Sequence, residues 1–205
     1  MEPSLRRLSL LTRFVISPIV KYLLSRSSDD MRTSVFVGIS LDGFLARKND
    51  SYDFLTLQPG EDNGYDAFMR TIDCIVLGRR TYEVVHSFAE WPYGQRLVIV
   101  LSRTLKEIKA PLGAVCELQN AAPREVVQDL EKRGMKHAYI DGGATIQSFL
   151  REGLVQEITI GRFPVLIGEG IPLFGWLPKD VKLELLGSAS FPSGAVRSEY
   201  RVLPS

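Results

Sequence analysis

The sequence holds few of the residues that disulfide-rich and metal-binding proteins require. Only two cysteines occur among its 205 residues, Cys74 and Cys116, and each lies inside an apolar run without a C-x-x-C partner. We therefore expect buried thiols in a reducing compartment rather than disulfides. The two histidines, His86 and His137, stand alone, and no H-x-E motif accompanies them. The sequence therefore predicts no metal site.

A surplus of charge of either sign is also missing. Lys and Arg total 25 and Asp and Glu total 24, which leaves a formal net charge of +1. A nucleic-acid partner is therefore not expected, because binding through a basic face needs a clear excess of Lys and Arg. The remaining composition, 45% apolar and 24% charged, is that of an ordinary globular domain with a sizeable core.

The first 30 residues lack an apolar run long enough to cross a bilayer. Arg13, Pro18 and Lys21 interrupt the apolar stretch well short of 18 residues, so we expect no integral membrane span. Residues 1–30 are therefore interpreted as an N-terminal extension, and residues 31–205 as the folded domain.

The composition of the extension leaves its role open. Residues 1–28 contain one acidic residue, six serines and several leucines, which is typical of an organellar transit peptide. Met31 stands immediately before the first expected strand, so a non-functional tail is an equal alternative, and contact with a membrane surface is a third. The expected location is cytoplasmic, or organellar if residues 1–28 are a transit peptide.

Apolar runs alternate with helical patterns along most of the chain, which predicts an α/β domain with a largely parallel sheet and helices on both faces. Expected strands cover residues 33–40, 73–78, 96–102, 114–118 and 137–142, and expected helices cover 66–72, 79–88, 122–134 and 143–153. The last fifty residues break the alternation with a strand at 155–166 and a hairpin, 181–191 and 195–203, around a Pro-Ser-Gly turn. One mixed sheet is therefore expected.

Three expected strands end in residues suited to an anion: "GRRTYE", "LSR" and "DGG". Ligands of open α/β sheets bind outside the carboxyl ends of the strands, where the first turn of a helix offers free N–H groups. Arg79, Arg80 and Arg103 come from separate strand ends, and a guanidinium binds phosphate with two parallel donors. Each feature alone is more often a solvated arginine or an ordinary turn, but their coincidence favours a polyanionic ligand.

Three aspartates are candidate catalytic acids. Asp42 in "SLDG" is such a candidate, although a turn residue that supports Gly43 is the interpretation that the pattern favours. Asp62 and Asp66 share a helix face if the helix begins that early, and they then face either solvent or the cleft. Asp62 lies near the end of a long loop, residues 41–64, and Asp66 follows it; long loops of this kind tend to carry function.

Two further residues are candidates for contact with a substrate. Asp141 either caps the helix that follows it or contacts a substrate beside the phosphates. Trp91, with Tyr93, lies in "EWPYG" and suits either stacking on a flat ring or filling the core.

Together these motifs resemble the dihydrofolate-reductase-like superfamily, and specifically the group similar to the C-terminal reductase domain of the bacterial riboflavin-biosynthesis deaminase/reductase. The resemblance covers about residues 31–203 through "SLDGFLA", "VLGRRTYE", "IVLSR", "IDGGATIQSFLREGLVQEITI" and "PVLIGEGIPLF". It implies a mixed sheet of about eight strands, NADPH as hydride donor and, often, a homodimer.

The resemblance also implies roles for single residues. It assigns to the cofactor Ile39, Arg79, Arg80, Thr81, Ser102, Arg103, Gly142, Gly143, Ala144 and Thr145. Residues 79–81 would bind phosphates, residues 102–103 would flank the 2′-phosphate, and residues 142–145 would wrap the pyrophosphate, with Ile39 near the nicotinamide. Asp141 would be an acidic contact of the substrate. The Gly142–Gly143 bond would be cis, and an ordinary trans bond would count against the cofactor interpretation.

The departures from the family leave the substrate open. "GRRTYE" stands where riboflavin reductases usually carry D-P-x-L-x-x-R, and no zinc-deaminase motif is present, so a bifunctional enzyme is not expected. The active-site carboxylate of dihydrofolate reductases has no secure match among Asp62, Gly64 and Asp66. We expect an NADPH-dependent reductase of a small C=N or C=C substrate. The alternatives are a non-catalytic nucleotide-binding or dimeric structural protein, and a nucleotide-binding enzyme that is not a reductase.

Overall fold

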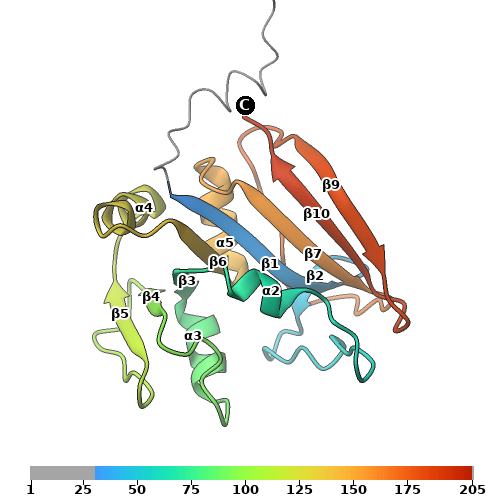
Figure 1. The fold of residues 1–205 in the computed structure, drawn as a ribbon, viewed down its shortest axis with the longest axis horizontal. Coiled ribbons are helices and arrows are strands. Elements are labelled where there is room, and N and C mark those ends of the chain that lie inside the picture. Colours follow the sequence, from blue (N-terminus) through green and yellow to red (C-terminus); the bar gives the residue numbers. More distant parts are fainter. Residues whose placement is uncertain (1–30, 205) are drawn as a thin grey trace, which may run out of the picture.

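The computed structural model describes residues 31–204, so the predictions for residues 1–30 lie outside the described residues. In the described part, strands alternate with helices up to β7 except that β2 follows β1 and β5 follows β4 without a helix, and the chain ends in a hairpin (Figure 1). The strands of the main sheet are β1 (Arg32–Ser40), β3 (Cys74–Gly78), β4 (Leu97–Leu101), β5 (Val115–Gln119), β6 (His137–Asp141), β7 (Glu157–Phe163), β9 (Leu183–Ser190) and β10 (Val196–Val202). The helices are α2 (Tyr65–Met69), α3 (Arg79–His86), α4 (Pro123–Lys132) and α5 (Gly143–Arg151).

The eight strands lie in the order β5-β4-β3-β6-β1-β7-β10-β9. The first six run parallel, whereas β10 is antiparallel to β7 and β9 is antiparallel to β10. The predicted α/β fold, a mostly parallel mixed sheet with an antiparallel C-terminal hairpin, is therefore confirmed. Among residues 31–204, no helix combines the length and apolar content needed to cross a membrane.

Helices cover both faces of the sheet, and a core lies on each side. On one face, Leu130 of α4 and Phe149 of α5 are buried against the strands. On the other face, Met69 of α2 and Tyr82 of α3 are buried. The central strands β3 and β4 read as continuous apolar runs, CIVLG and LVIVL, because both of their faces are covered. Cys74 is buried as predicted, whereas Cys116 is half-buried, and both are free thiols.

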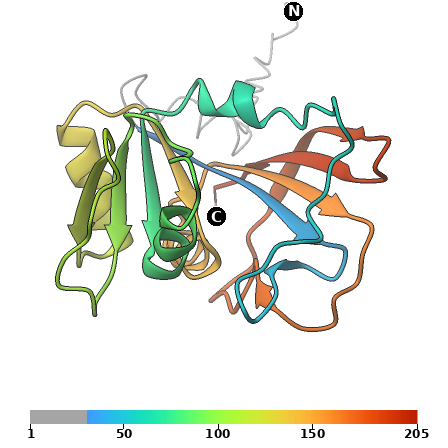
Figure 2. The same ribbon diagram turned by 90° about the horizontal axis from the view of Figure 1, so that it is seen from below.

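The sheet opens between β6 and β1. These strands pair at three positions, which end at Ser34 opposite Tyr139. Beyond Ser34, β1 pairs only with β7, as far as Phe163. Figure 2 shows β1 running away from β3 and its neighbours toward β7 and the hairpin. The carboxyl ends of β6 and β1 therefore separate, and residues after Tyr139 face that opening.

A second, small sheet was not predicted, and one of its strands lies in the loop expected at 41–64. It pairs β2 (Phe44–Ala46) with β8 (Ile171–Pro172) in antiparallel fashion. Segments of three and two residues are too short to show an alternating pattern in a sequence. The small sheet joins the loop after β1 to the glycine-rich segment after β7.

Candidate functional site

Two helix N-termini meet at the carboxyl edge of the sheet. Helix α3 follows β3 directly, α5 follows β6 after one residue, and β3 lies beside β6. A Cβ atom placed on Gly78 would lie 2.9 Å from Oγ1 of Thr145, and one placed on Gly142 would overlap the Thr81 hydroxyl. The first turns of the two helices therefore touch, and only glycine fits at these two contacts.

Neither helix start is closed by the protein itself. The N-cap residues are Gly78 and Gly142, and no side chain of the described residues caps either helix. The first N–H groups of each helix, together with the Thr81 and Thr145 hydroxyls, are donors beside the positive end of the helix dipole. Two such ends side by side suit a ligand with two phosphate groups.

The peptide bond between Gly142 and Gly143 is trans, since residues 31–204 contain no cis peptide bond. The expectation of a cis bond is therefore wrong, and this counts against the cofactor interpretation. The turn is made instead by the backbone of Gly142, with φ 87° and ψ 133°. Glycine reaches this region without the cost that a non-proline cis bond carries, about 2.5–4 kcal/mol.

The arginines of the first turn of α3 are already engaged by carboxylates. Arg79 lies 3.1 Å from Glu83, one turn along the same helix. Arg80 lies 2.7 Å from Asp50 and donates to the carbonyl oxygen of Lys48 at 3.3 Å. Both side chains are about half exposed, so each guanidinium remains within reach of an incoming anion.

Residues 102–103 follow the neighbouring strand β4, whose Leu101 pairs with Gly78. The Ser102 hydroxyl accepts hydrogen bonds from the N–H groups of Thr104 (3.2 Å) and Leu105 (3.0 Å). This turn holds Arg103 exposed at the same edge of the sheet as the two helix starts. The three strand ends that the sequence analysis singled out follow β3, β4 and β6. These strands are neighbours in the sheet, in the order β4-β3-β6.

The small sheet lies against the start of α5. A Cβ atom on Gly143 would lie 3.0 Å from the carbonyl oxygen of Pro172 and 3.2 Å from Cδ1 of Leu45. Gly143 is buried, whereas the next residue, Ala144, is exposed. The sequence analysis did not predict this contact between the small sheet and α5, although the glycines of "IGEGIPLF" are a signal of close backbone approach.

Asp141 sits at the opening between β6 and β1, within a group of tyrosines. Its Oδ1 accepts the N–H of Gly142 at 2.7 Å, and its Oδ2 accepts the Tyr93 hydroxyl at 3.3 Å. The Tyr139 hydroxyl donates to the carbonyl oxygen of Phe36 at 2.8 Å and so bridges the two strands. Burial raises the pKa of Asp141 although these hydrogen bonds oppose the shift. The carboxyl group can therefore hold a proton at higher pH than an exposed aspartate.

Trp91 and Tyr93 form one wall of this group. Tyr93 is buried in the core and its ring meets that of Trp91 edge-to-face, with centroids 5.3 Å apart. The Trp91 Nε1 atom is buried and has no hydrogen-bond partner among the described residues. Arg96, three residues after Tyr93, ties this segment to the end of α2 by donating to the carbonyl oxygens of Met69 (2.9 Å) and Ile72 (3.0 Å). Tyr93 thus fills the core, and Trp91 packs beside it.

Asp42 is held in the turn that follows β1. Its carboxylate accepts the Ser40 hydroxyl at 2.6 Å and the N–H groups of Gly168 (2.7 Å) and Ile167 (3.1 Å). The Ser40 hydroxyl, with these N–H groups, lowers the pKa of Asp42. A carboxylate held in its charged form ties the loop after β7 to the end of β1, and it is a poor proton donor.

Asp62 and Asp66 do not share a helix face. Helix α2 begins at Tyr65, because Gly64 precedes it with a left-handed φ of 82°. Asp62 lies before the helix and accepts the N–H of Gly64 at 2.7 Å. Asp66 is exposed in the first turn. Ile39 is buried near the end of β1, at 3% exposure.

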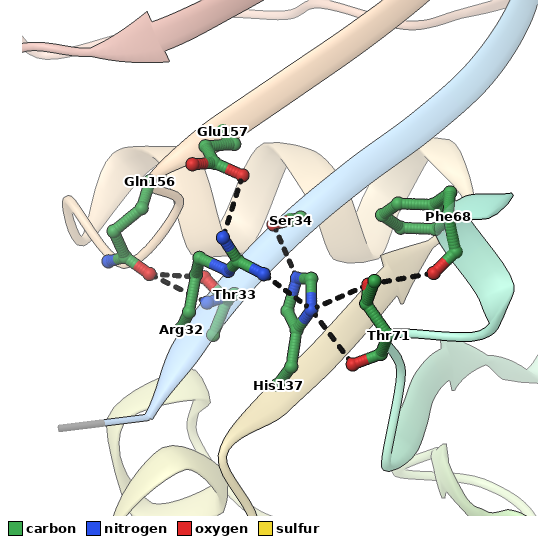
Figure 3. Close-up of polar contacts among 8 residues, drawn as sticks. All are labelled: Arg32, Thr33, Ser34, Phe68, Thr71, His137, Gln156 and Glu157. Carbon is green, nitrogen blue, oxygen red and sulfur yellow. Dashed lines mark hydrogen bonds and ion pairs between the residues drawn. The ribbon is translucent and has the colours of Figure 1, made fainter. Parts of the chain in front are cut away.

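A polar cluster around the buried His137 lies at the opposite end of the same strands (Figure 3). His137 contacts the guanidinium of Arg32 (3.0 Å) and the hydroxyls of Ser34 (2.8 Å) and Thr71 (3.0 Å). It joins β6 to β1 and to the segment after α2, so its role is structural. Within residues 31–204, no group of three or more His, Cys, Asp or Glu residues is arranged to hold a metal ion.

Residues 33–197 match the family model of the RibD C-terminal domain. The chain belongs to that family. A RibD C-terminal domain is the reductase-type part that the sequence motifs resemble, so the family assignment is confirmed. The same residues include the two helix starts and the tyrosine-lined carboxyl group.

Known relatives of this RibD C-terminal domain span nearly the whole described chain. The uncharacterized protein YwjB of Bacillus subtilis (strain 168) is 32% identical over 174 residues, covering 83% of this chain and 98% of YwjB. A solved structure from Shewanella sp. PV-4, named for a proposed role in riboflavin biosynthesis, shares 35% identity and a TM-score of 0.76. It covers 84% of this chain and 99% of its own.

A dihydrofolate reductase from Enterococcus faecalis, solved as a complex with NADP(H) and RAB-propyl, has the same fold. Its TM-score is 0.61 at 15% identity, over 86% of this chain and 98% of that one. At this identity the likeness concerns the fold alone. The RibD C-terminal domain described here is therefore dihydrofolate-reductase-like in architecture.

Proposed function

We propose that this RibD C-terminal domain is an NADPH-dependent reductase that reduces a C=N or C=C bond of a small molecule. The observation that carries the proposal is the meeting of two uncapped helix N-termini, those of α3 and α5, at the carboxyl edge of the sheet. The likeness to a dihydrofolate reductase solved with NADP(H) and to a protein named for riboflavin biosynthesis supports it. The trans bond after Gly142 is the observation that stands against it.

The chain's own residues suit the parts of this cofactor. The N–H groups of residues 79–81 and 143–145, with the hydroxyls of Thr81 and Thr145, would hold the phosphates. Arg79 and Arg103 would hold the 2′-phosphate end, next to the turn made by Ser102. Ile39 would line the nicotinamide side. When bound, NADPH supplies the hydride, and the protein's task is to orient the acceptor carbon and exclude water.

The geometry favours Asp141 over the other acids as proton donor. Asp141 lies beside the start of α5 with a raised pKa, whereas Asp42 is held as a carboxylate by its hydrogen bonds. Asp66 acts on Tyr65 through its charge, and the catalytic roles of Asp62 and Asp66 stay predictions. Asp141 would donate its proton to the substrate atom next to the reduced carbon, become a carboxylate and regain a proton from water.

The walls of the opening suit a flat substrate. Tyr65 and Tyr139 meet edge-to-face with ring centroids 6.4 Å apart, and Trp91 lies beside Tyr93. Aromatic walls around one carboxyl group favour a nitrogen heterocycle or a short imine, similar to the substrates of the pyrimidine and folate reductases. As in the family that the sequence resembles, the protein would act as a homodimer.

The proposal is tested by titrating the protein with NADPH and with NADH, following the fluorescence of the reduced nicotinamide. Arg79→Ala combined with Arg103→Ala should weaken NADPH binding by roughly 10- to 100-fold, because charged hydrogen bonds to the 2′-phosphate are lost. NADH binding should change much less. Arg151→Ala, at the far end of α5, is the matched control and should leave both affinities unchanged.

Equal losses for both cofactors would overturn the assignment of the 2′-phosphate, and failure of the wild type to bind either would overturn the cofactor site. A non-catalytic nucleotide-binding protein is the second candidate, favoured by the engagement of Asp42 in a turn. That candidate predicts tight NADPH binding without loss of NADPH absorbance on pterins, folates or the riboflavin precursor.

A further inference from the structure

A hollow of about 400 Å³ lies at the end of the sheet opposite the candidate site. It is bounded by the C-terminal ends of α5 and β10 and by the segment before β9. We call it the terminal groove, and its apolar lining consists of Leu150, Val155, Pro178, Val181, Val202 and Leu203. Its volume falls in the range of pockets that bind ligands, about 300–1,000 Å³, so the groove can take up several apolar side chains.

The terminal groove has an apolar floor and a charged rim. Leu150 and Val155 are buried, and Val202 is half-buried. Arg151 and Lys179 are exposed at the rim, and neither forms an ion pair with another residue of the part that the structure describes. An apolar floor below a charged rim suits an amphipathic segment of polypeptide, because its apolar side chains meet the floor while its polar groups stay at the rim.

The described chain begins beside this groove. Gln156 lines the terminal groove and also a smaller hollow of about 220 Å³, which is lined by Met31 and Thr33 as well. The N–H of Gln156 donates to the carbonyl oxygen of Thr33 at 3.0 Å, and its carbonyl oxygen accepts the N–H of Val202 at 2.8 Å. Figure 1 shows the start of β1 and the end of β10 at the same end of the sheet. The residues before Met31 therefore enter the fold next to the terminal groove.

The sequence just before Met31 has the composition of an apolar segment on a polar tether. Residues 19–24 read IVKYLL, and Lys21 is the one charged residue among them. Residues 25–30 read SRSSDD and contain no apolar side chain. Six residues can span at most about 20 Å. The tether is therefore long enough to carry the apolar segment from Met31 to a groove beside it.

We propose that residues 19–24 of this chain dock in the terminal groove and that residues 25–30 are their tether. A segment on a short tether is present at an effective concentration of about millimolar, which favours it over a free partner of similar affinity at micromolar concentration. Its apolar side chains would pack on Val155, Val181 and Leu203. The driving force is the burial of an apolar run and of the groove floor, both of which otherwise stay in water.

The charges of the segment and of the groove also match. Asp29 and Asp30, at the end of the tether next to Met31, would lie near the cations of the rim, Arg151 and Lys179. Lys21 would extend to the rim, since the long side chain of lysine keeps its ammonium group in water. Salt screens such exposed charges but not apolar packing, so docking should persist at high salt.

Docking would make residues 19–30 a part of the folded protein. Removal of residues 1–28 as a transit peptide would strip the groove of its cover, and a non-functional tail would leave the groove empty. A membrane surface would compete with the groove for the same apolar side chains. The proposal does not rest on the proposed reductase activity, because the groove lies at the other end of the sheet.

Hydrogen exchange of the full chain tests the proposal. Amides of residues 19–24 should exchange roughly 10-fold or more slowly than those of residues 5–12. The protection should be the same at about 1 and 100 µM protein, because the contact is intramolecular. Leu23→Glu should abolish it, and so should Val181→Glu on the side of the groove. The matched controls are Leu10→Glu in the extension and Leu112→Glu at a fully exposed loop position, and both should keep it.

Fast exchange of residues 19–24 in the wild type overturns the proposal, as does protection that survives both Leu23→Glu and Val181→Glu. Protection that rises with protein concentration means that a second copy binds the segment, and protection that appears only with vesicles of anionic lipid means that a membrane does. Either result overturns the intramolecular contact. If circular dichroism shows that Val181→Glu does not fold, Leu23→Glu decides alone, because Leu23 lies outside the described fold.

Discussion

His137 shows how a buried residue acquires its protonation state from its neighbours. Nδ1 of the ring lies 3.0 Å from the Arg32 guanidinium and 3.1 Å from the carbonyl oxygen of Thr71. A guanidinium can only donate a hydrogen bond and a carbonyl oxygen can only accept one, so these two neighbours favour opposite roles for Nδ1. Nε2 lies 2.8 Å from the Ser34 hydroxyl. Burial, followed by the charge of Arg32, lowers the pKa of His137 from its usual 6.5 to about 4.

This shift predicts a pH dependence of stability. The unfolded chain takes up a proton at His137 near pH 6.5, but the folded chain does so only near pH 4. Between these values the unfolded state binds more protons, so the free energy of unfolding falls as the pH is lowered. The slope is about 1.4 kcal/mol per pH unit, and the total is about 3 kcal/mol, fully present above pH 6.5.

The measurement is chemical denaturation of wild type and His137→Gln from pH 4.5 to 7.5. The variant should be less stable at pH 7.5 but should lose much less between pH 6.5 and 4.5. The raised pKa of Asp141 changes the stability in the opposite direction as the pH falls, and it does so in both proteins. The difference between the two proteins therefore isolates the contribution of His137. His86→Gln, at an exposed site, is the control. An unchanged slope in His137→Gln would contradict the prediction.

Gly142 combines backbone conformation with close packing. Its φ of 87° is unfavourable for other residues, and a Cβ atom would overlap the Thr81 hydroxyl. Gly142→Ala should lower the free energy of unfolding by about 1–3 kcal/mol and also disturb the meeting of α3 and α5. Gly113→Ala is the matched control, because Gly113 has φ 77° but open space around it. The loss measured by denaturation should be larger at Gly142, and equal losses would show that the contact with Thr81 is unimportant.

The loop between β2 and α2 carries a contact that competes with an incoming anion. Asp50 forms an ion pair with Arg80 at the start of α3. The backbone of Asp50 is left-handed, with φ 68°. Asp50→Asn keeps that conformation accessible and removes the charge. If the phosphates of NADPH bind there, the variant should bind NADPH about 2- to 5-fold more tightly, the range expected for an exposed ion pair.

Glu169→Gln provides the control for this loop. Glu169 pairs with Lys48, two residues from Asp50, but does not touch Arg80, so its loss should leave NADPH affinity unchanged. Titration at two salt concentrations separates the effects, since the difference between Asp50→Asn and wild type should shrink at high salt. Weaker NADPH binding by Asp50→Asn would show that Asp50 supports the site rather than competing for it.

The elements that the sequence predicted are those with a repeated pattern. Buried runs such as LVIVL and the helix opened by Pro123 were placed within one or two residues, because burial and capping act locally. The small β2–β8 sheet was missed, because its pairing depends on contacts between segments about 125 residues apart. The start of α2 was set by Gly64, and this separated Asp62 from Asp66.

Only some features of the site could be predicted from the sequence, whereas most of the fold could. The meeting of residues 79–81 with 142–145 follows from the rule that strand ends share one edge of a sheet, so the sequence could reveal it. The tyrosines around Asp141 could not be found in that way, because they come from α2, from the loop before β4 and from β6 itself. Only the folded chain brings these three segments together.

The molecule as a whole depends on α5, which bridges the two halves of the opened sheet. Phe149 is fully buried in a core that contains Ile140 of β6 and also Val35 and Ile158 of β1 and β7. Because β6 and β1 pair at only three positions, this packing rather than strand pairing joins the halves. Phe149→Ala should lower the free energy of unfolding by about 3–5 kcal/mol, and Phe149→Leu by clearly less.

The bridge also predicts how the chain unfolds. If α5 makes the halves one cooperative unit, unfolding followed by tryptophan fluorescence and by far-UV circular dichroism should give one coincident transition in wild type and in Phe149→Leu. Trp91 packs against the core on the opposite face from α5, in the half that contains β3 and β4. The other tryptophan, Trp176, is 75% exposed, so the change in fluorescence on unfolding comes mainly from Trp91. Leu112→Ala, at an exposed position, should leave the midpoint unchanged. Two separated transitions in the wild type would mean that the sheet opening divides the molecule into two folding units, each stabilised by its own core.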